Sequence, residues 1–127
     1  MSDWYKFRGW DATGQKGWVY GDLTHTKKIL KDEPFLSDRV MVGGYEVVPE
    51  SVGLCTGLSD CEGRNIYEGD IVQWSKDGNK YVVKFRSGMF YASVEEFNKG
   101  VYGGFPLWVL CEEEQPCEIV GNVFENK

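Results

Sequence analysis

Alternation of apolar and polar residues with a period of two predicts short β-strands along much of the chain. In the N-terminal half this pattern predicts strands at Trp4–Trp10, Trp18–Leu23, His25–Leu30, Arg39–Val42 and Tyr45–Val48. Gly43-Gly44 separates the last two of these segments, and a two-glycine turn favours a β-hairpin. Arg8 and Trp10 share one face of the first strand, so we expect cationic side chains to lie across indole rings there.

The middle of the chain predicts a meander of three antiparallel strands. Ile66–Trp74 is apolar, with Glu68-Gly69-Asp70 as a kink inside it. Asp77-Gly78 then predicts a tight hairpin to the next strand, in which Tyr81, Val83 and Phe85 are assigned to the core face. Ser87-Gly88 turns the chain again, into a strand at Met89–Val94.

The remainder of the chain predicts further short elements. Glu95–Gly104 is compatible with one helical turn, and Phe105–Leu110 reads as an apolar strand with Pro106 near its start. Glu112–Pro116 is an exposed acidic loop, and Glu118–Phe124 is a final strand.

The fold class predicted from these segments is mainly β with little helix. Turn signals recur every 8–12 residues, which favours a compact barrel or a pair of small sheets. A length of 127 residues, with 42% hydrophobic and 15% aromatic residues, is enough for one domain spanning 1–127 with its own core.

The net charge of −6 argues against a nucleic-acid-binding protein, since such proteins usually present a basic patch. The densest basic group, Lys27, Lys28 and Lys31, is followed at once by Asp32 and Glu33. No apolar stretch approaches the roughly 20 residues of a membrane helix, and the N-terminus lacks a secretory pattern. We therefore expect no membrane association and a cytoplasmic location.

The four cysteines do not have the spacing of a common zinc site. Cys55 and Cys61 are separated by five residues, as are Cys111 and Cys117, whereas zinc knuckles usually have two to four. We expect buried or free thiols, no metal and no cofactor. His25, the single histidine, stands between two threonines and is expected at the surface, as are the carboxylates of Glu112–Glu114.

Glu68 and Asp70 have two readings. A pair of carboxylates can serve acid–base chemistry. Glu-Gly-Asp between strands also suits a tight turn, with Gly at positive φ and Asp bonding a nearby backbone N–H. The chain has no Walker A pattern, dinucleotide-binding glycine motif or nucleophile elbow, so we favour the turn and a protein that is not an enzyme.

Four segments of the chain together resemble the YopX family of phage and prophage proteins. These are KFRGWD at Lys6–Asp11, VGLCTGLSDCEGRNIYEGDIVQW at Val52–Trp74, VVKFRSGMFY at Val82–Tyr91 and EIVGNVFEN at Glu118–Asn126. The family typically has KFRAWD in the first segment, so Gly9 replaces a common Ala. The four cysteines also look particular to this chain.

The resemblance implies a mostly β fold whose C-terminal half is a small SH3-like barrel, with additional N-terminal strands packed on it. It also implies a temperate phage or prophage origin and makes homo-oligomers plausible, but it implies no activity. The residues that match the family pattern are candidates for shared structure first and shared function second. With Trp74, they supply the candidate binding residues Arg8, Trp10, Asp11, Tyr67, Glu68, Asp70 and Trp74.

Three functions are compatible with the sequence. The leading hypothesis is a non-enzymatic phage accessory protein that binds a host or phage protein through surplus aromatic residues. The second is binding of single-stranded nucleic acid on a barrel face, by stacking and a basic groove built from Lys80, Lys84, Arg86, Lys99, Trp74 and Tyr91. The third is an enzyme or a small-molecule binder that uses the Glu68–Asp70 turn.

Overall fold

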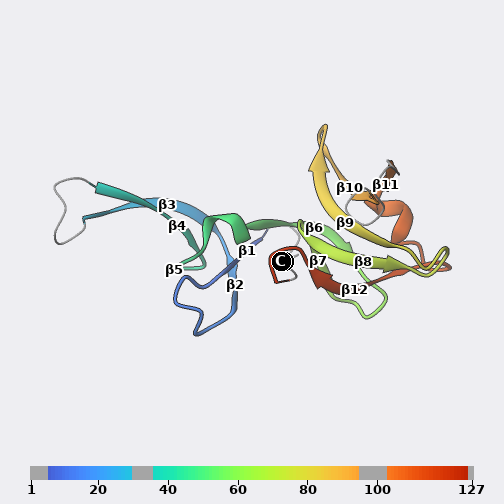
Figure 1. Ribbon diagram of the computed structural model, residues 1–127, viewed down its shortest axis with the longest axis horizontal. Helices are drawn as coiled ribbons and strands as arrows, with labels where there is room; N and C mark the ends of the chain where they lie inside the picture. The colour runs from blue at the N-terminus through green and yellow to red at the C-terminus, as the bar shows by residue number, and fades with distance from the viewer. Residues whose placement is uncertain (1–5, 30–35, 95–102, 126–127) are drawn as a thin grey trace. The chain divides into compact units, whose positions relative to one another are not determined.

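The computed structural model describes residues 6–29, 36–94 and 103–125. The described chain forms two compact units, one of Lys6–Leu54 and the other from Cys55 onward. The boundary falls within strand β6 (Gly53–Ser59), which begins in the first unit and continues into the second (Figure 1). The prediction of a single domain over the whole chain stays a prediction.

The N-terminal unit is built from antiparallel strands around a small valine core. The elements, in chain order, are β1 (Phe7–Trp10), β2 (Trp18–Gly21), β3 (Leu23–Ile29), β4 (Leu36–Val42), β5 (Tyr45–Glu46) and a 3₁₀ helix, η1 (Pro49–Ser51). Strand β1 lies between β2 and the start of β6, while β4 lies between β3 and β5. Val19, Val42 and Val47 are buried together.

The break between the second and third strands falls at Asp22 rather than at Thr24, where the polarity pattern placed it. The expected strand Trp18–Leu23 ends at Gly21, and β3 begins after Asp22. A Cβ atom on Gly21 would lie 2.8 Å from the Cα of Gly43, so the two backbones touch at this point. The predicted hairpin at Gly43-Gly44 is confirmed, with both glycines at positive φ.

The C-terminal unit contains a five-stranded antiparallel sheet in the order β11-β10-β9-β8-β12 (Figure 1). Its elements after β6 are β7 (Asn65–Tyr67), β8 (Asp70–Trp74), β9 (Lys80–Arg86), β10 (Met89–Ser93), β11 (Gly104–Pro106), the 3₁₀ helix η2 (Leu107–Leu110) and β12 (Cys117–Asn122). The core of this unit gathers Ile66, Val72, Trp74, Tyr81, Val83, Ala92, Leu107, Leu110 and Cys117.

The mainly β class is confirmed, and the described residues form no helix other than η1 and η2. None of the sheets closes into a barrel. Closure would require β11 to pair with β12, but the chain between them forms η2 and a loop closed by a Cys111–Pro116 bridge. No described helix is long and apolar enough to cross a membrane.

Three details of the sequence prediction were wrong. Phe105–Leu110 is not one strand, because the chain turns into a 3₁₀ helix that buries Leu107 and Leu110 three positions apart. Phe85 is 51% exposed rather than in the core, since β9 extends beyond its buried half. Strand β6 was not predicted, because Gly53 and Gly57 interrupt the alternation of apolar and polar side chains. The helical turn expected within Glu95–Gly104 falls largely outside the described residues.

Candidate functional site

The hairpin of β9 and β10 carries two exposed large apolar side chains of the C-terminal unit, Phe85 at 51% and Met89 at 40%. Ser87 and Gly88 both have positive φ (53° and 81°), the conformation of the tight primed turns that match strand twist. The register places Phe90 opposite Phe85 and Met89 opposite Arg86. Because side chains alternate along each strand, the hairpin presents two distinct faces.

One face of the hairpin extends from the buried core to a partly exposed pair of phenylalanines. Near the base of the hairpin, Val83 and Ala92 are buried. At the tip, Phe85 is 51% exposed and packs edge-to-face on half-buried Phe90, with ring centroids 5.0 Å apart. An aromatic pair that stabilises itself while leaving half of one ring in water is a preformed apolar contact surface.

The other face of the hairpin is basic and aromatic. Lys80, Lys84 and Arg86 alternate along β9, so they point to this face. Tyr91 lies opposite Lys84, and the Arg86 guanidinium stands 5.7 Å from the centre of its ring. Met89, 40% exposed, completes this face at the tip. No Asp or Glu occurs from position 78 to position 94, although the chain as a whole is acidic.

Trp74 does not join this basic face. It is 4% exposed and lies on the core side of β8, where its ring packs edge-to-face on Phe105 and Tyr81. Its indole N–H donates to the Gln115 carbonyl at 2.8 Å. The geometry therefore places Trp74 on the core side of the sheet, and it does not contribute to the basic face of the hairpin. Lys99, another residue of the predicted groove, is outside the described residues.

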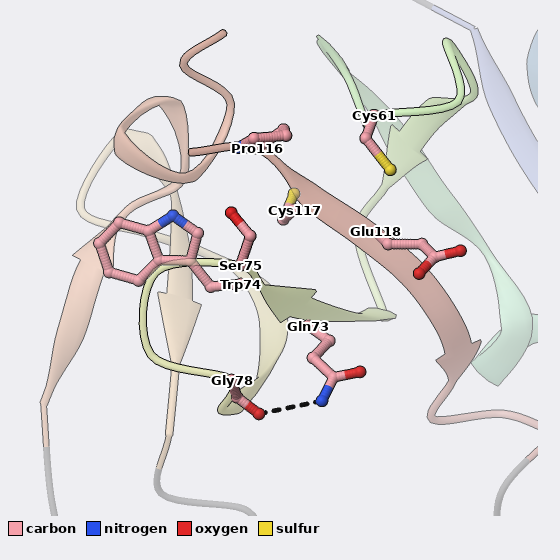
Figure 2. A pocket seen from close by; sticks show the side chains of 8 residues that line it. All are labelled: Cys61, Gln73, Trp74, Ser75, Gly78, Pro116, Cys117 and Glu118. Atoms are coloured by element: carbon pink, nitrogen blue, oxygen red, sulfur yellow. Dashed lines mark hydrogen bonds between the residues drawn. The ribbon is translucent and has the colours of Figure 1, made fainter. Parts of the chain in front are cut away.

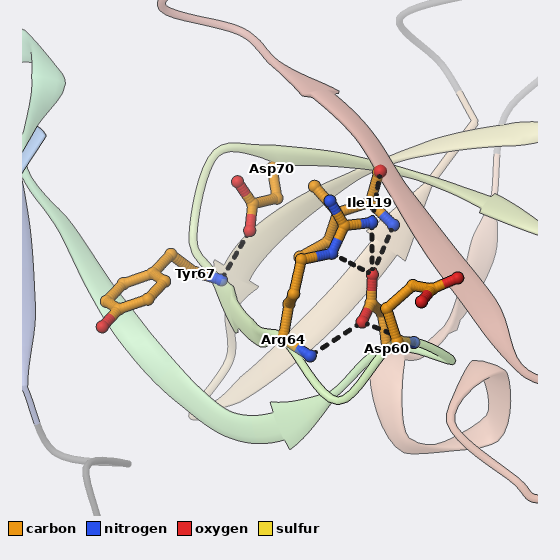
Figure 3. Close-up of polar contacts among 6 residues, drawn as sticks. Asp60, Arg64, Tyr67, Asp70 and Ile119 are labelled. Atoms are coloured by element: carbon orange, nitrogen blue, oxygen red, sulfur yellow. Dashed lines mark hydrogen bonds and ion pairs between the residues drawn. The ribbon is translucent and has the colours of Figure 1, made fainter. Parts of the chain in front are cut away.

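The Glu68–Asp70 segment has the geometry of a turn. Gly69 has φ of 94°, and the buried carboxylate of Asp70 accepts the Tyr67 backbone N–H at 2.8 Å (Figure 3). Gly69 itself donates its N–H to Val83 and accepts from Val123. The positive φ of Gly69 and the hydrogen bond of Asp70 are the features that the turn reading predicted. A buried aspartate held by its own turn is poorly placed for acid–base chemistry.

The candidates Arg8, Trp10 and Asp11 are structural parts of the N-terminal unit. The Arg8 guanidinium lies 4.3 Å from the centre of the Trp18 ring, and the ring of Trp10 meets Trp18 edge-on at 5.4 Å. The predicted cation–aromatic packing is thus present, with Trp18 as the ring. Asp11 accepts hydrogen bonds from Thr13 and the Lys16 backbone. The Thr13 hydroxyl is the main reason that the pKa of Asp11 is lowered.

The carboxylate of Asp60 accepts several hydrogen bonds in the C-terminal unit, and sequence analysis noted this residue only as part of the family pattern. Its oxygens accept the backbone N–H groups of Glu62, Arg64 and Ile119, together with the Arg64 side chain (Figure 3). Burial by itself would raise the pKa of Asp60, but these hydrogen bonds outweigh it and lower the pKa. The partner Ile119 is 59 positions away, so no local signal could have revealed this role.

A hollow of about 300 Å³ lies beside the start of β12 (Figure 2). Its lining residues are Cys61, Gln73, Trp74, Ser75, Gly78, Pro116, Cys117 and Glu118. The Gln73 amide is already engaged with the Gly78 carbonyl at 2.9 Å. The site can accommodate a small apolar group, although the Glu68–Asp70 turn, where a small-molecule site was predicted, is not part of its lining.

All four cysteines are free thiols, as expected: Cys55 and Cys117 are buried, Cys111 is half-buried and Cys61 is exposed. Within the described ranges, no three His, Cys, Asp or Glu side chains are grouped as a metal site. His25 is exposed, and so are Glu112–Glu114.

The comparison with protein families gives one result that spans nearly the whole chain. The model of the family described as YopX protein matches residues 6–127, which includes both compact units and the β9–β10 hairpin. A search of curated proteins found no match.

Proposed function

Because this chain belongs to the YopX family, we propose that it is a phage or prophage accessory protein that acts in the host cytoplasm by binding another protein, without catalysis. The proposed contact region is the tip of the β9–β10 hairpin, here called the hairpin tip and defined as Phe85 and Phe90 on one face with Arg86 and Met89 on the other. The observation that carries the proposal is the half-exposed ring of Phe85, which packs on Phe90.

Physical chemistry favours this surface for a protein partner. Interface hot spots are enriched in aromatic residues and Arg, and they lie in contact patches that become fully desolvated. The hairpin tip supplies two Phe rings, a Met and an Arg on a rigid pair of strands. A two-strand scaffold with a tight turn loses little conformational entropy on binding, because its geometry is already formed.

Affinity capture from phage-carrying host cells tests the proposal. The protein should retain a specific polypeptide, and Phe85→Ser combined with Met89→Ser should reduce its recovery at least about tenfold, as expected for loss of hot-spot contacts. Tyr20→Ser is the matched control, because Tyr20 is an aromatic residue with the same 51% exposure in the N-terminal unit. Equal recovery by the wild type and the double variant would contradict the proposed surface.

A second candidate function, binding of single-stranded nucleic acid, is favoured by the basic face of the same hairpin. Lys80, Lys84 and Arg86 share this face with Tyr91, in a segment without acidic residues. Fluorescence anisotropy with a labelled oligodeoxynucleotide at low salt tests it. Binding that weakens steeply with salt and with Lys84→Gln would support it; absence of binding at low salt would end it.

We also propose that the protein forms a homo-oligomer, as the family resemblance implies. The native mass in solution measures it directly.

A further inference from the structure

The hollow beside the start of β12 has walls that backbone contacts hold in place. Cys117 lies directly opposite Trp74 in the antiparallel pair of β8 and β12, and the Cys61 N–H donates to the Cys117 carbonyl at 2.8 Å. The Ser75 N–H donates to the Pro116 carbonyl at 3.1 Å. These contacts join three separate parts of the chain around a volume of about 300 Å³ (Figure 2). A ligand can therefore enter a site that is already formed.

Apolar surface forms one part of the lining. Trp74 is 4% exposed, and its indole N–H is already bound to the Gln115 carbonyl at 2.8 Å, so its ring offers only apolar atoms to the hollow. Cys117 is buried beside it, and Pro116 contributes its ring. A hollow of about 300 Å³ bounded by an indole and a proline ring suits a small molecule with a compact apolar body.

Polar groups form the other part of the lining, and one of them is charged. Gln73 and Glu118 lie directly opposite each other on β8 and β12. The Gln73 side chain donates to the Gly78 carbonyl at 2.9 Å, which holds the amide in place (Figure 2). The Glu118 carboxylate is exposed and forms no hydrogen bond or ion pair with the described residues. Its oxygens are therefore available to a ligand.

The charges around the hollow favour a cation. The eight described residues that line it include no Lys, Arg or His. Arg64, which is close by, is ion-paired with Asp60 at 2.8 Å, and the Lys76 ammonium stands outside the lining, 5.4 Å from the centre of the Trp74 ring. The pKa of the Cys61 thiol is raised, first by desolvation and then by neighbouring carboxylates. The electrostatic potential at this edge of the hollow is therefore negative.

We propose that the hollow binds a small organic cation, namely a primary amine with a compact apolar body, such as an arylalkylamine. The apolar body packs against the rings of Trp74 and Pro116. The ammonium group donates a charge-assisted hydrogen bond to the Glu118 carboxylate, and the carbonyl oxygen of the Gln73 amide is a second acceptor. No residue of the hairpin tip lines the hollow, so this inference does not depend on the proposed protein partner.

Protection of Cys61 from alkylation tests the proposal at the site itself, because Cys61 is exposed and lines the hollow, whereas Cys111 is outside the lining. The probe is 2-phenylethylamine, compared with neutral 2-phenylethanol and anionic phenylacetate. In the full chain, the amine should slow the alkylation of Cys61 by iodoacetamide in a saturable manner and leave Cys111 unaffected, as measured by peptide mass spectrometry. No protection by the amine, or equal protection by all three compounds, would overturn the proposal.

Two variants test the role assigned to Glu118, each compared with its own alkylation rate in the absence of the amine. Glu118→Gln keeps the length of the side chain but removes its charge, so it should raise the amine concentration that gives half protection at least about threefold. Glu113→Gln, in the exposed acidic loop and outside the lining, is the matched control and should behave like the wild type. Equal effects of the two substitutions would show general charge attraction and contradict the site.

Discussion

The carboxylate of Asp60 accepts the backbone N–H of Ile119 at 3.0 Å, joining two parts of the chain that are 59 positions apart. Arg64 adds a second link, because its guanidinium forms an ion pair with Asp60 and donates to the Ile119 carbonyl. The Cys61 N–H also donates to the Cys117 carbonyl. The segment 60–64 thus occupies the outer edge of β12, an edge that would otherwise be open to pairing with another strand.

Replacing Asp60 should destabilise the C-terminal unit severely. Asp60→Ala removes the acceptor of three backbone N–H groups and is expected to cost about 2–4 kcal/mol, because three part-buried hydrogen bonds and an ion pair are lost together. Denaturant unfolding of the full chain measures this. Glu62→Ala is the control: its side chain is exposed, so it should change stability by no more than about 0.5 kcal/mol. Similar losses in the two variants would refute the assigned role.

Asp60 also predicts how stability responds to acid. Its pKa is lowered in the folded state, so the unfolded chain takes up a proton first as the pH falls. Its contribution should be complete above the ordinary Asp pKa of 3.8 and should disappear as the pH falls through the lower folded value. Unfolding curves of the wild type and Asp60→Asn should therefore converge below about pH 4. A constant difference down to pH 2 would contradict this linkage.

Tyr81 predicts how the stability of the folded state responds to alkaline pH. Burial, followed by the hydrogen bond that its hydroxyl donates to Asp77, raises the pKa of Tyr81 to about 12. A raised pKa stabilises the folded state below the unfolded tyrosine pKa of about 10, and this stabilisation is lost as the pH rises through 12. Absorbance of tyrosinate should show a late step that Tyr81→Phe removes and Asp77→Asn shifts to lower pH. If neither substitution affects the late step, the step belongs to a different tyrosine and the prediction is wrong.

Gly9, which replaces an alanine common in the family pattern, lies so close to Val47 that a side chain would clash there. A Cβ atom on Gly9 would lie 2.9 Å from three carbon atoms of buried Val47. Gly9→Ala should therefore destabilise the chain by about 1–3 kcal/mol through overpacking. Val47→Ala removes two of these three carbon atoms and leaves the Cβ, so it relieves part of the clash and the double variant should lose less than the sum of the single losses. Additive losses in denaturant unfolding would show that the two positions do not compete for space.

Local turn chemistry made part of the fold predictable from sequence. Gly43-Gly44 and Ser87-Gly88 reverse the chain as tight turns, and Gly69 turns it between β7 and β8. Asp77-Gly78 also reverses the chain, but within a longer loop between Trp74 and Lys80 in which only Gly78 of the pair has positive φ. Each of these turns is determined by residues adjacent in the chain, so it could be predicted from the local sequence.

The rest depended on contacts between distant residues. Phe85 follows the alternation of a core strand, but the core ends before it does, and only the packed structure defines that limit. The same reason applies to Trp74, an expected ligand-contacting residue that the sheet buries, and to Asp60, whose partner is on β12.

The central claim is that the hairpin tip contacts a protein partner, and photo-crosslinking from position 85 tests it most directly. A photoreactive benzoyl-phenylalanine in place of Phe85 should crosslink, in phage-carrying host cells, to one specific polypeptide. The same group in place of Tyr20, equally exposed at 51%, should not capture that polypeptide. Crosslinks to the same protein from both positions, to nucleic acid, or to nothing from position 85 would contradict the account.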